Sequence, residues 1–147
     1  MKLSTMKCLK LLADPTRLRM LLLLHNQALS VAELQEILGM GQSRISTQLS
    51  LLKQEGMVTD QRSGKNNIYQ AELPELLLSL ARQAAEELPE CPKDLSALRH
   101  LIRKRKDKAR SYFDELAGKF GKSYVPGRSW KALAEALIKV MNYDVVA

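Results

Sequence analysis

The chain has 147 residues, of which 46% are hydrophobic, 27% are charged and 5% are aromatic, and its net charge is +7. This length allows one compact core with an extension, and leucines spaced by three and four favour packed helices over a sandwich of strands. The two cysteines are too few for a disulfide framework, and no run of about 18 apolar residues and no cleavable leader is visible. We therefore expect a cytoplasmic protein with no membrane partner, for which the positive charge permits a polyanionic one.

Two helices open the chain. The first is predicted over about residues 4–13, with one face marked by Met6, Leu9, Leu12 and Ala13. Asp14 then provides an N-cap for a second helix, and Pro15 takes its first position, where a missing N–H costs nothing. The residues expected to face inward on this second helix are Leu18, Leu21, Leu22 and His25.

A third helix is predicted to begin at Val31, because Ser30 and Glu33 have the spacing of a capping box. It should end at Gly39, which tolerates the left-handed conformation that terminates helices. Its inward residues are predicted to be Val31, Leu34, Ile37 and Leu38.

A fourth helix, about residues 42–55, follows after a tight turn through Gly41. It should bury Ile45, Leu49 and Leu52, while the opposite side is polar and almost uncharged, with Ser43, Thr47, Ser50 and Gln54. Exposed helices usually carry Glu and Lys, whereas short hydrogen-bonding side chains suit close approach to bases and phosphates. The pattern predicts a DNA-reading face, and a merely serine-rich surface is the alternative.

Two β-prone runs, residues 57–62 and 68–71, flank the turn-forming sequence SGKNN and predict a hairpin. Four helices followed by a hairpin is the order of a winged helix-turn-helix. The predicted fold is therefore mainly α with a small β-hairpin, followed by a helical C-terminal extension. Arg62 and Lys65 would lie on or near the tip of the wing.

A fifth helix, about residues 74–88, is more apolar than one core requires, with Leu76, Leu77, Leu80, Ala81, Ala84 and Leu88. Cys91 and Pro92 are predicted to break the helix, and a long helix over about 94–120 should follow. We accordingly divide the chain into a winged helix-turn-helix DNA-binding domain, 1–90, to which the resemblance described below assigns dimerisation as well, and a helical extension, 91–147. Seven Lys or Arg residues between positions 99 and 110 make either a solvated helix face or a contact to flanking DNA.

The tail is predicted to hold a loop and a last helix carrying Trp130, Leu133, Leu137 and Val140, before the sequence DVVA begins a strand. Because a lone strand needs a partner, this pattern suggests that the sequence is a fragment.

Residues 9–69 resemble the ArsR/SmtB family of winged-helix repressors through LLADPTRLRMLLLL, SVAELQEILGMGQSRISTQLSLLKQEGMV and the wing RSGKNNIYQ. The resemblance implies contacts to double-stranded DNA by Gln42, Ser43, Arg44, Ser46, Thr47 and Gln48 of the fourth helix and by Arg62 and Lys65 of the wing. Many relatives have His where this chain has Gln48. Glutamine can hydrogen-bond an adenine edge in two places, so this departure concerns the target sequence and not the mode of binding.

The resemblance also implies a homodimer built from the first and fifth helices, with Leu9, Leu77, Leu80 and Ala84 at the interface. Two recognition helices would then enter successive major grooves about 34 Å apart, on an inverted-repeat operator. The family's metal sites need thiolates or imidazoles. Because the third helix lacks the cysteine pair and the fifth lacks His, we expect an effector other than a metal at those sites. Cys8 and Cys91 are either idle thiols or a redox or metalloid switch.

The tail, YFDELAGKFGKSYVPGRSWKALAEALIKVMNYDVVA, resembles the junction in ArsR-methyltransferase fusions, whose further domain binds S-adenosylmethionine or S-adenosylhomocysteine. This chain ends before any cofactor loop, and His25 and His100 are isolated, so we expect no metal, no cofactor and no enzymatic activity in it. The leading prediction is a DNA-binding repressor. The alternatives are a targeting or dimerising segment of a methyltransferase, and a protein-interaction module, against which the polar fourth helix argues.

Overall fold

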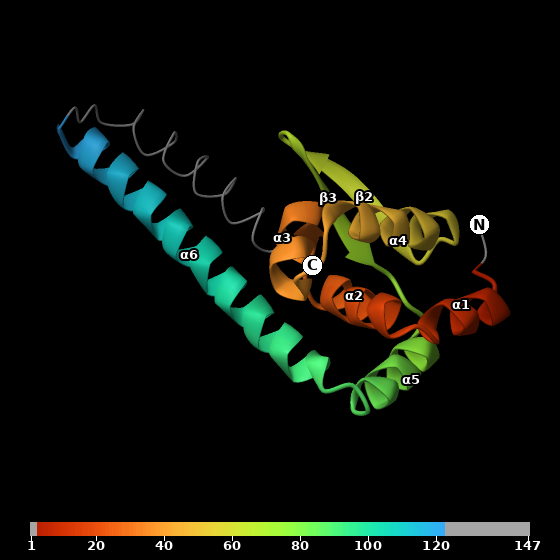
Figure 1. Ribbon diagram of the computed structural model, residues 1–147. Helices are drawn as coiled ribbons and strands as arrows, with labels where there is room; N and C mark the ends of the chain where they lie inside the picture. Colours follow the sequence, from red (N-terminus) through yellow and green to blue (C-terminus); the bar gives the residue numbers. More distant parts are fainter. Residues whose placement is uncertain (1–2, 123–147) are drawn as a thin grey trace. The chain divides into compact units, whose positions relative to one another are not determined.

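The computed structural model describes residues 3–122, with the backbone alone for 120–122 (Figure 1). Its helices are α1 (Thr5–Leu12), α2 (Pro15–Asn26), α3 (Val31–Leu38), α4 (Gln42–Gln54), α5 (Glu75–Ala85) and α6 (Glu90–Lys122). Its strands are β1 (Leu29–Ser30), β2 (Val58–Ser63) and β3 (Asn66–Ala71). These elements confirm a mainly α, winged helix-turn-helix fold. The residues up to Leu98 form one compact unit, and those from Arg99 form a second.

Helix α1 buries only part of the apolar face marked in its sequence. Ser4 caps it by accepting from the amide of Lys7, and Cys8, Leu11 and Leu12 are buried. Met6 and Leu9 are instead 77% and 41% exposed. The short helix packs on α2 and α5 with a single 3–4 spaced row, which leaves the next row outside.

Helix α2 is the centre of the first unit. The Asp14 carboxylate accepts from the amide of Arg17 at 3.0 Å, and Pro15 lies at the first position, as predicted. The prediction was wrong for Leu22 and His25, which are half-buried. Because α1, α5 and β3 all pack on this helix, its burial extends around most of its circumference, to Thr16, Leu18, Met20, Leu21, Leu23 and Leu24.

The helix-turn-helix is formed by α3 and α4. The capping box is present: Ser30 Oγ accepts from the Glu33 amide at 3.2 Å, and Glu33 Oε1 accepts from the Ser30 amide at 2.9 Å. Gly39 ends α3 with φ of +67°, a conformation that glycine adopts without strain. Leu34, Ile37 and Leu38 are buried as predicted, and Val31 is half-buried.

A three-stranded antiparallel sheet has β3 at its centre, in the order β1-β3-β2. The predicted hairpin is confirmed, with Ser63 opposite Asn66 across the loop of Gly64 and Lys65. Positive φ at Gly64 alone is the sign pattern of a type II′ turn. The short strand β1, in which Leu29 pairs with Tyr69, was not predicted, because two residues carry no periodicity.

The break between α5 and α6 lies at a different place from the one predicted. Helix α5 ends at Ala85, and α6 begins at Glu90, so Cys91 and Pro92 lie inside the first turn of α6. Proline is tolerated there because the first amides of a helix have no intrahelical partner. On α5 the buried residues are Leu77, Leu78 and Ala81.

The predicted helix carrying Trp130 and the strand after it fall outside the described residues, as does the part of the predicted methyltransferase junction beyond Lys122. Within residues 3–122, none of the helices has the length and apolarity that crossing a bilayer requires.

Candidate DNA-binding surface

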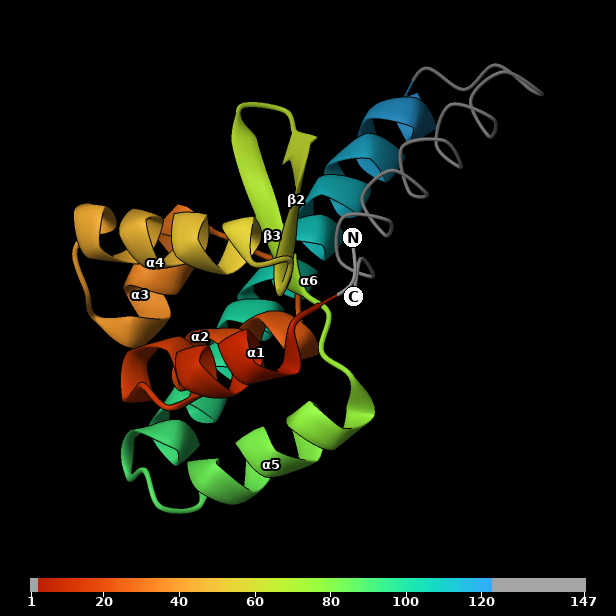
Figure 2. The same ribbon diagram turned by 90° about the vertical axis from the view of Figure 1, so that its right-hand side faces the viewer.

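Helix α4 is held to the first unit by its apolar side. Ile45, Leu49 and Leu52 are all buried, and the helix packs on α3 and β2. Figure 2 shows α4 beside the foot of the hairpin, which projects away from α1 and α2. The opposite side of α4 is therefore left to solvent.

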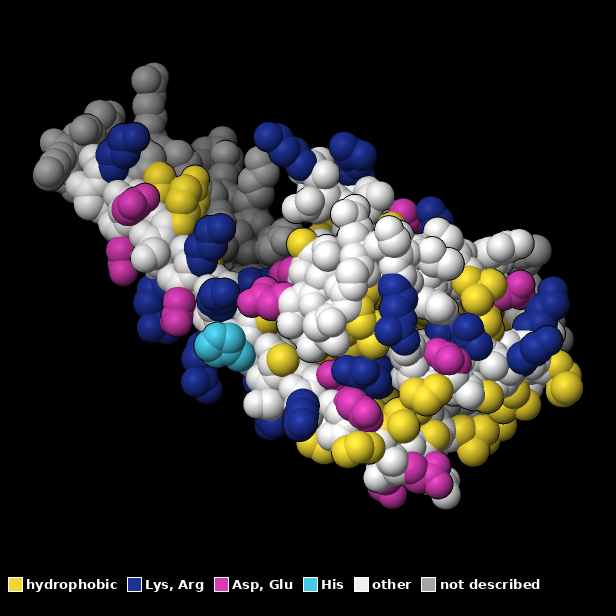
Figure 3. Space-filling view, viewed as in Figure 1, with side chains coloured by type: hydrophobic (Ala, Val, Ile, Leu, Met, Phe, Trp, Pro, Cys, Tyr) yellow, Lys and Arg dark blue, Asp and Glu magenta, His cyan; other side chains and the backbone are white. Residues whose placement is uncertain are grey.

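The predicted DNA-contacting residues of α4 all lie on or beside this outer side. Gln42, Ser43, Arg44 and Thr47 are exposed, and Ser46 and Gln48 are half-buried. The surface over α4 is largely white in Figure 3, the colour of uncharged polar side chains and backbone. The helix thus presents hydrogen-bonding groups with little charge, which suits discrimination between bases more than attraction to phosphates.

The wing carries cations at its far end. Arg62 is exposed on β2, opposite Asn67, and Lys65 is exposed in the turn. Dark blue side chains mark the tip of the hairpin in Figure 3. Lys53 and Asp60, by contrast, form an ion pair of 2.9 Å between α4 and β2, and the hydrogen bond to Asp60 raises the pKa of Lys53. The Asp60 carboxylate is thus neutralised by Lys53 at the base of the hairpin, away from the cationic tip.

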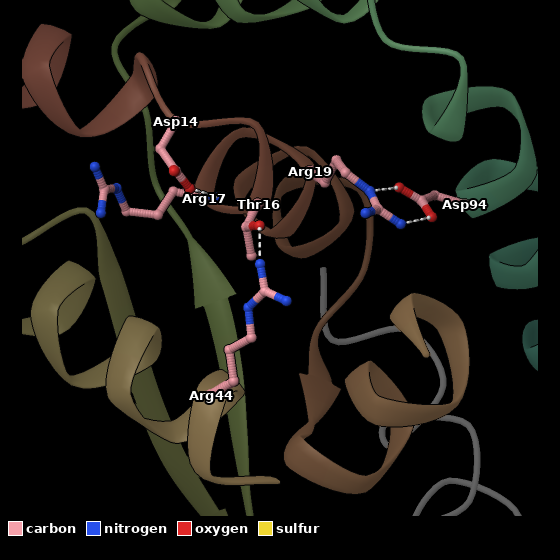
Figure 4. A network of polar contacts seen from close by, with 6 residues as sticks. All are labelled: Asp14, Thr16, Arg17, Arg19, Arg44 and Asp94. Atoms are coloured by element: carbon pink, nitrogen blue, oxygen red, sulfur yellow. Dashed lines mark hydrogen bonds and ion pairs between the residues drawn. The ribbon is translucent and has the colours of Figure 1, made fainter. Parts of the chain in front are cut away.

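Two residues of α2 that the sequence analysis did not single out, Thr16 and Arg17, form hydrogen bonds to α4. Arg44 Nη2 donates to Thr16 Oγ1 at 3.1 Å (Figure 4). Arg17 donates from Nε to the Leu11 carbonyl at 2.9 Å and from Nη1 to Gln48 Oε1 at 3.4 Å. Thr16 and Arg17 belong to the DPTRLR sequence, but no spacing rule relates them to residues 28 and 31 positions away.

Thr47 is already engaged with its own helix. Its hydroxyl donates to the Ser43 carbonyl at 2.8 Å. With its proton directed at the backbone, the hydroxyl offers acceptor lone pairs and a methyl group to the outside. Such a side chain matches an amino group on a base, or the methyl group of thymine.

An apolar surface lies over α1 and α5, which pack against each other, and it is the yellow region at the lower right of Figure 3. Its exposed members are Met6, Leu9, Leu76 and Leu80. Of the predicted dimer residues, Leu9 and Leu80 lie in this surface and Ala84 is half-buried. Leu77 is buried within its own chain and offers little area to a second copy.

The two cysteines have weakly acidic thiols. Burial, and then the charge of Glu55, raises the pKa of Cys8, which is 1% exposed. Burial and Asp94 raise the pKa of Cys91, which is half-buried, against an opposing effect of Arg19. Among the described residues of a single chain, no three His, Cys, Asp or Glu side chains are grouped to hold a metal ion.

In the second unit, helix α6 carries a basic row. Arg99, Arg103, Lys106 and Arg110 are exposed, and their spacing of three and four places them on one side of the helix.

The comparisons with known proteins agree on the kind of protein. Residues 14–60 match the family described as "Bacterial regulatory protein, arsR family". The chain is 43% identical over 61 residues to the HTH-type transcriptional regulator NmtR of Mycobacterium tuberculosis, covering 42% of this chain and 51% of that protein. It is 39% identical over 77 residues to an uncharacterized HTH-type transcriptional regulator of the same species, covering 50% of this chain and 68% of the relative.

Among solved structures, the transcriptional repressor BigR from Xylella fastidiosa is similar, with a TM-score of 0.50 and 29% identity. The match covers 56% of this chain and 84% of BigR. The chain therefore spans about half the length of NmtR, and a larger share of the other two proteins.

Proposed function

The chain belongs to the arsR family of bacterial regulatory proteins, and on that premise we propose that it is a transcriptional repressor that binds an inverted-repeat operator as a homodimer. The observation that carries the proposal is the outer side of α4, which is exposed and hydrogen-bonding while its inner side is fully buried. A helix anchored in this way can enter the major groove without losing its own support. The repressor would act in the cytoplasm, where bacterial DNA lies.

The two parts of the surface would divide the work of binding. The major groove, about 12 Å wide, admits α4, whose side chains from Gln42 to Gln48 would contact base edges and nearby phosphates. Arg62 and Lys65 on the wing would bind phosphates or the minor groove. No ion pair engages Arg44, Arg62 or Lys65 within the described part of the chain, so their charges are available to DNA.

The apolar surface on α1 and α5 supports a dimer. Met6 and Leu76 are more than two-thirds exposed, and contiguous exposed apolar side chains favour a protein interface. A two-fold axis through this surface would pair two copies of α4, in keeping with half-sites about 34 Å apart. The operator would then be an inverted repeat.

We propose that the effector is not a metal bound at the usual family sites. Helix α3 has no cysteine and α5 has no histidine, so neither presents the thiolates or imidazoles of those sites. A switch through Cys8 and Cys91 remains the alternative, and the raised pKa of each thiol argues against it.

The test is fluorescence anisotropy of the chain on inverted-repeat duplexes selected from a random library, at about 50 and 200 mM salt. We expect tight, sequence-selective and salt-dependent binding, with the sequence preference lost in Arg44→Ala. Lys93→Ala removes an exposed cation from the start of α6 and serves as the matched control, which should keep the preference. Binding no tighter than to random duplexes, unchanged by Arg44→Ala, would contradict the proposal and favour a protein-interaction module.

A further inference from the structure

Arg17 holds Gln48 from the neighbouring helix. Its backbone amide donates to the Asp14 carboxylate at 3.0 Å, and its Nε donates to the Leu11 carbonyl at 2.9 Å. The bond to Leu11 fixes the guanidinium at the junction of α1 and α2. From this position its Nη1 lies 3.4 Å from Gln48 Oε1. Gln48 contacts a positioned donor that belongs to another element.

The chemistry of this contact determines which way the Gln48 amide faces. A guanidinium has five N–H donors and no acceptor, so only the amide oxygen can face it. Within residues 3–122, Gln48 makes no other side-chain hydrogen bond. The amide nitrogen, on the other side of the planar group, is therefore directed away from Arg17 with both of its protons available.

The charge of Arg17 reinforces this orientation. None of the ion pairs in the described residues includes Arg17, and the Asp14 carboxylate accepts from its backbone amide. A cation beside the amide oxygen repels a second donor approaching from a base, such as the adenine amino group. The Arg17–Gln48 pair as a whole therefore offers donors and positive potential.

We propose that Arg17 is a positioning residue that makes Gln48 a donor to DNA, so that the operator position read by Gln48 prefers guanine to adenine. Guanine presents two acceptors in the major groove, N7 and O6, whereas adenine presents an acceptor and a donor. An unrestrained glutamine pairs with adenine through both amide atoms. This inference rests on the proposed function and specifies which base one of its contacts selects.

The experiment first locates the base position. Binding of Gln48→Ala to operators substituted at each position identifies the one whose base preference is lost. At that position the guanine-to-adenine affinity ratio is measured for the unchanged chain and for Arg17→Met. We expect the unchanged chain to prefer guanine by about tenfold, within the range of a good base contact, and Arg17→Met to shift the ratio toward adenine by a similar factor.

Two controls separate this effect from folding and from general charge loss. Arg62→Met removes a wing cation and should weaken binding to both operators equally, leaving the ratio unchanged. Arg17→Lys keeps the charge and a donor, and should retain part of the guanine preference. Because a partly unfolded sample lowers both affinities by the same factor, the ratio reports base choice and not stability.

Several outcomes would overturn the inference. One is a preference for adenine in the unchanged chain, and another is a ratio that Arg17→Met leaves unaltered. A third is that Gln48→Ala keeps the base preference of the unchanged chain at every operator position. A shift that persists when Arg17→Met is combined with Gln48→Ala would mean that Arg17 itself contacts the DNA. Absence of sequence-selective binding by the unchanged chain would instead contradict the proposed function.

Discussion

Arg19 and Asp94 form a two-point ion pair between the middle of α2 and the beginning of α6. Arg19 Nε lies 2.7 Å from Asp94 Oδ2, and Nη2 lies 2.9 Å from Oδ1 (Figure 4). The two side chains are only 14% and 5% exposed. Both groups are thus largely withdrawn from water, and Asp94 is the main group that compensates the charge of Arg19, with a smaller contribution from Glu90.

Breaking this pair from one side should be strongly destabilising. Asp94→Asn removes the carboxylate that hydrogen-bonds the Arg19 guanidinium and leaves only the charge of Glu90 to compensate it, so we expect the free energy of unfolding to fall by about 3 kcal/mol. Replacing both partners, with Arg19→Met and Asp94→Leu together, should restore most of that loss, because two apolar side chains need no compensation. Urea denaturation followed by circular dichroism measures both.

The exposed ion pair of Lys53 and Asp60 provides the comparison. Lys53→Gln should leave the urea midpoint nearly unchanged, since exposed pairs contribute little to stability. If Asp94→Asn proved equally mild, the carboxylate would not be compensating a buried charge.

Removal of wing cations should weaken DNA binding without changing base choice. Arg62→Ala and Lys65→Ala are each expected to lower the affinity for operator and random duplexes by the same factor, and to reduce the slope of log Kd against log salt by about 1. Titrations at four salt concentrations give this slope. An altered base preference in either variant would instead place that side chain among the base-reading groups.

A charge in the apolar surface should dissociate the dimer. Leu80→Asp desolvates a carboxylate at the proposed interface, so sedimentation velocity should show a monomer where the unchanged chain sediments as a dimer. Leu95→Asp is the matched control, because both leucines are 44% exposed and Leu95 lies on α6, outside the surface. A monomer produced by Leu95→Asp and not by Leu80→Asp would place the interface elsewhere.

The thiols should be unreactive at neutral pH. Burial raises the pKa of both Cys8 and Cys91 above the ordinary 9.0, which lowers the fraction of reactive thiolate at any pH below that value. Iodoacetamide labelling should therefore be slow at pH 7 and accelerate as the pH rises past 9, with half-buried Cys91 ahead of Cys8. Labelling followed by mass spectrometry gives both rates, and the chain unfolded in guanidinium supplies the reference. Fast labelling of the folded chain at pH 7 would support a redox switch.

Local rules predicted the parts of the fold that depend on neighbouring residues. The Asp14 cap, Pro15 at the helix start, the Ser30–Glu33 box and the end of α3 at Gly39 all involve groups within a few positions of one another. Each of these groups satisfies backbone atoms of its own helix, so the outcome does not depend on the rest of the chain.

The parts that failed depend on distant partners. Periodicity indicates which residues share a face, but it does not say which face another element covers, and so it left the buried side of α1 open and underestimated the burial of α2. Pairing of Leu29 with Tyr69 joins segments 40 positions apart. The contact from Arg17 to Gln48 likewise spans 31 positions, and only the tertiary fold brings the start of α2 within side-chain reach of α4.

Ser30 has two structural roles at once. It pairs with Ile68 in the sheet, and its hydroxyl caps the first turn of α3. No flexible residue therefore separates the sheet that carries the wing from the first helix of the helix-turn-helix, and there is no hinge between them. Helix α4 packs on both α3 and β2, so we expect the wing and α4 to move together. In the proposed dimer, adaptation to operators of different half-site spacing would therefore come from movement of one protomer against the other, and not from bending within a protomer.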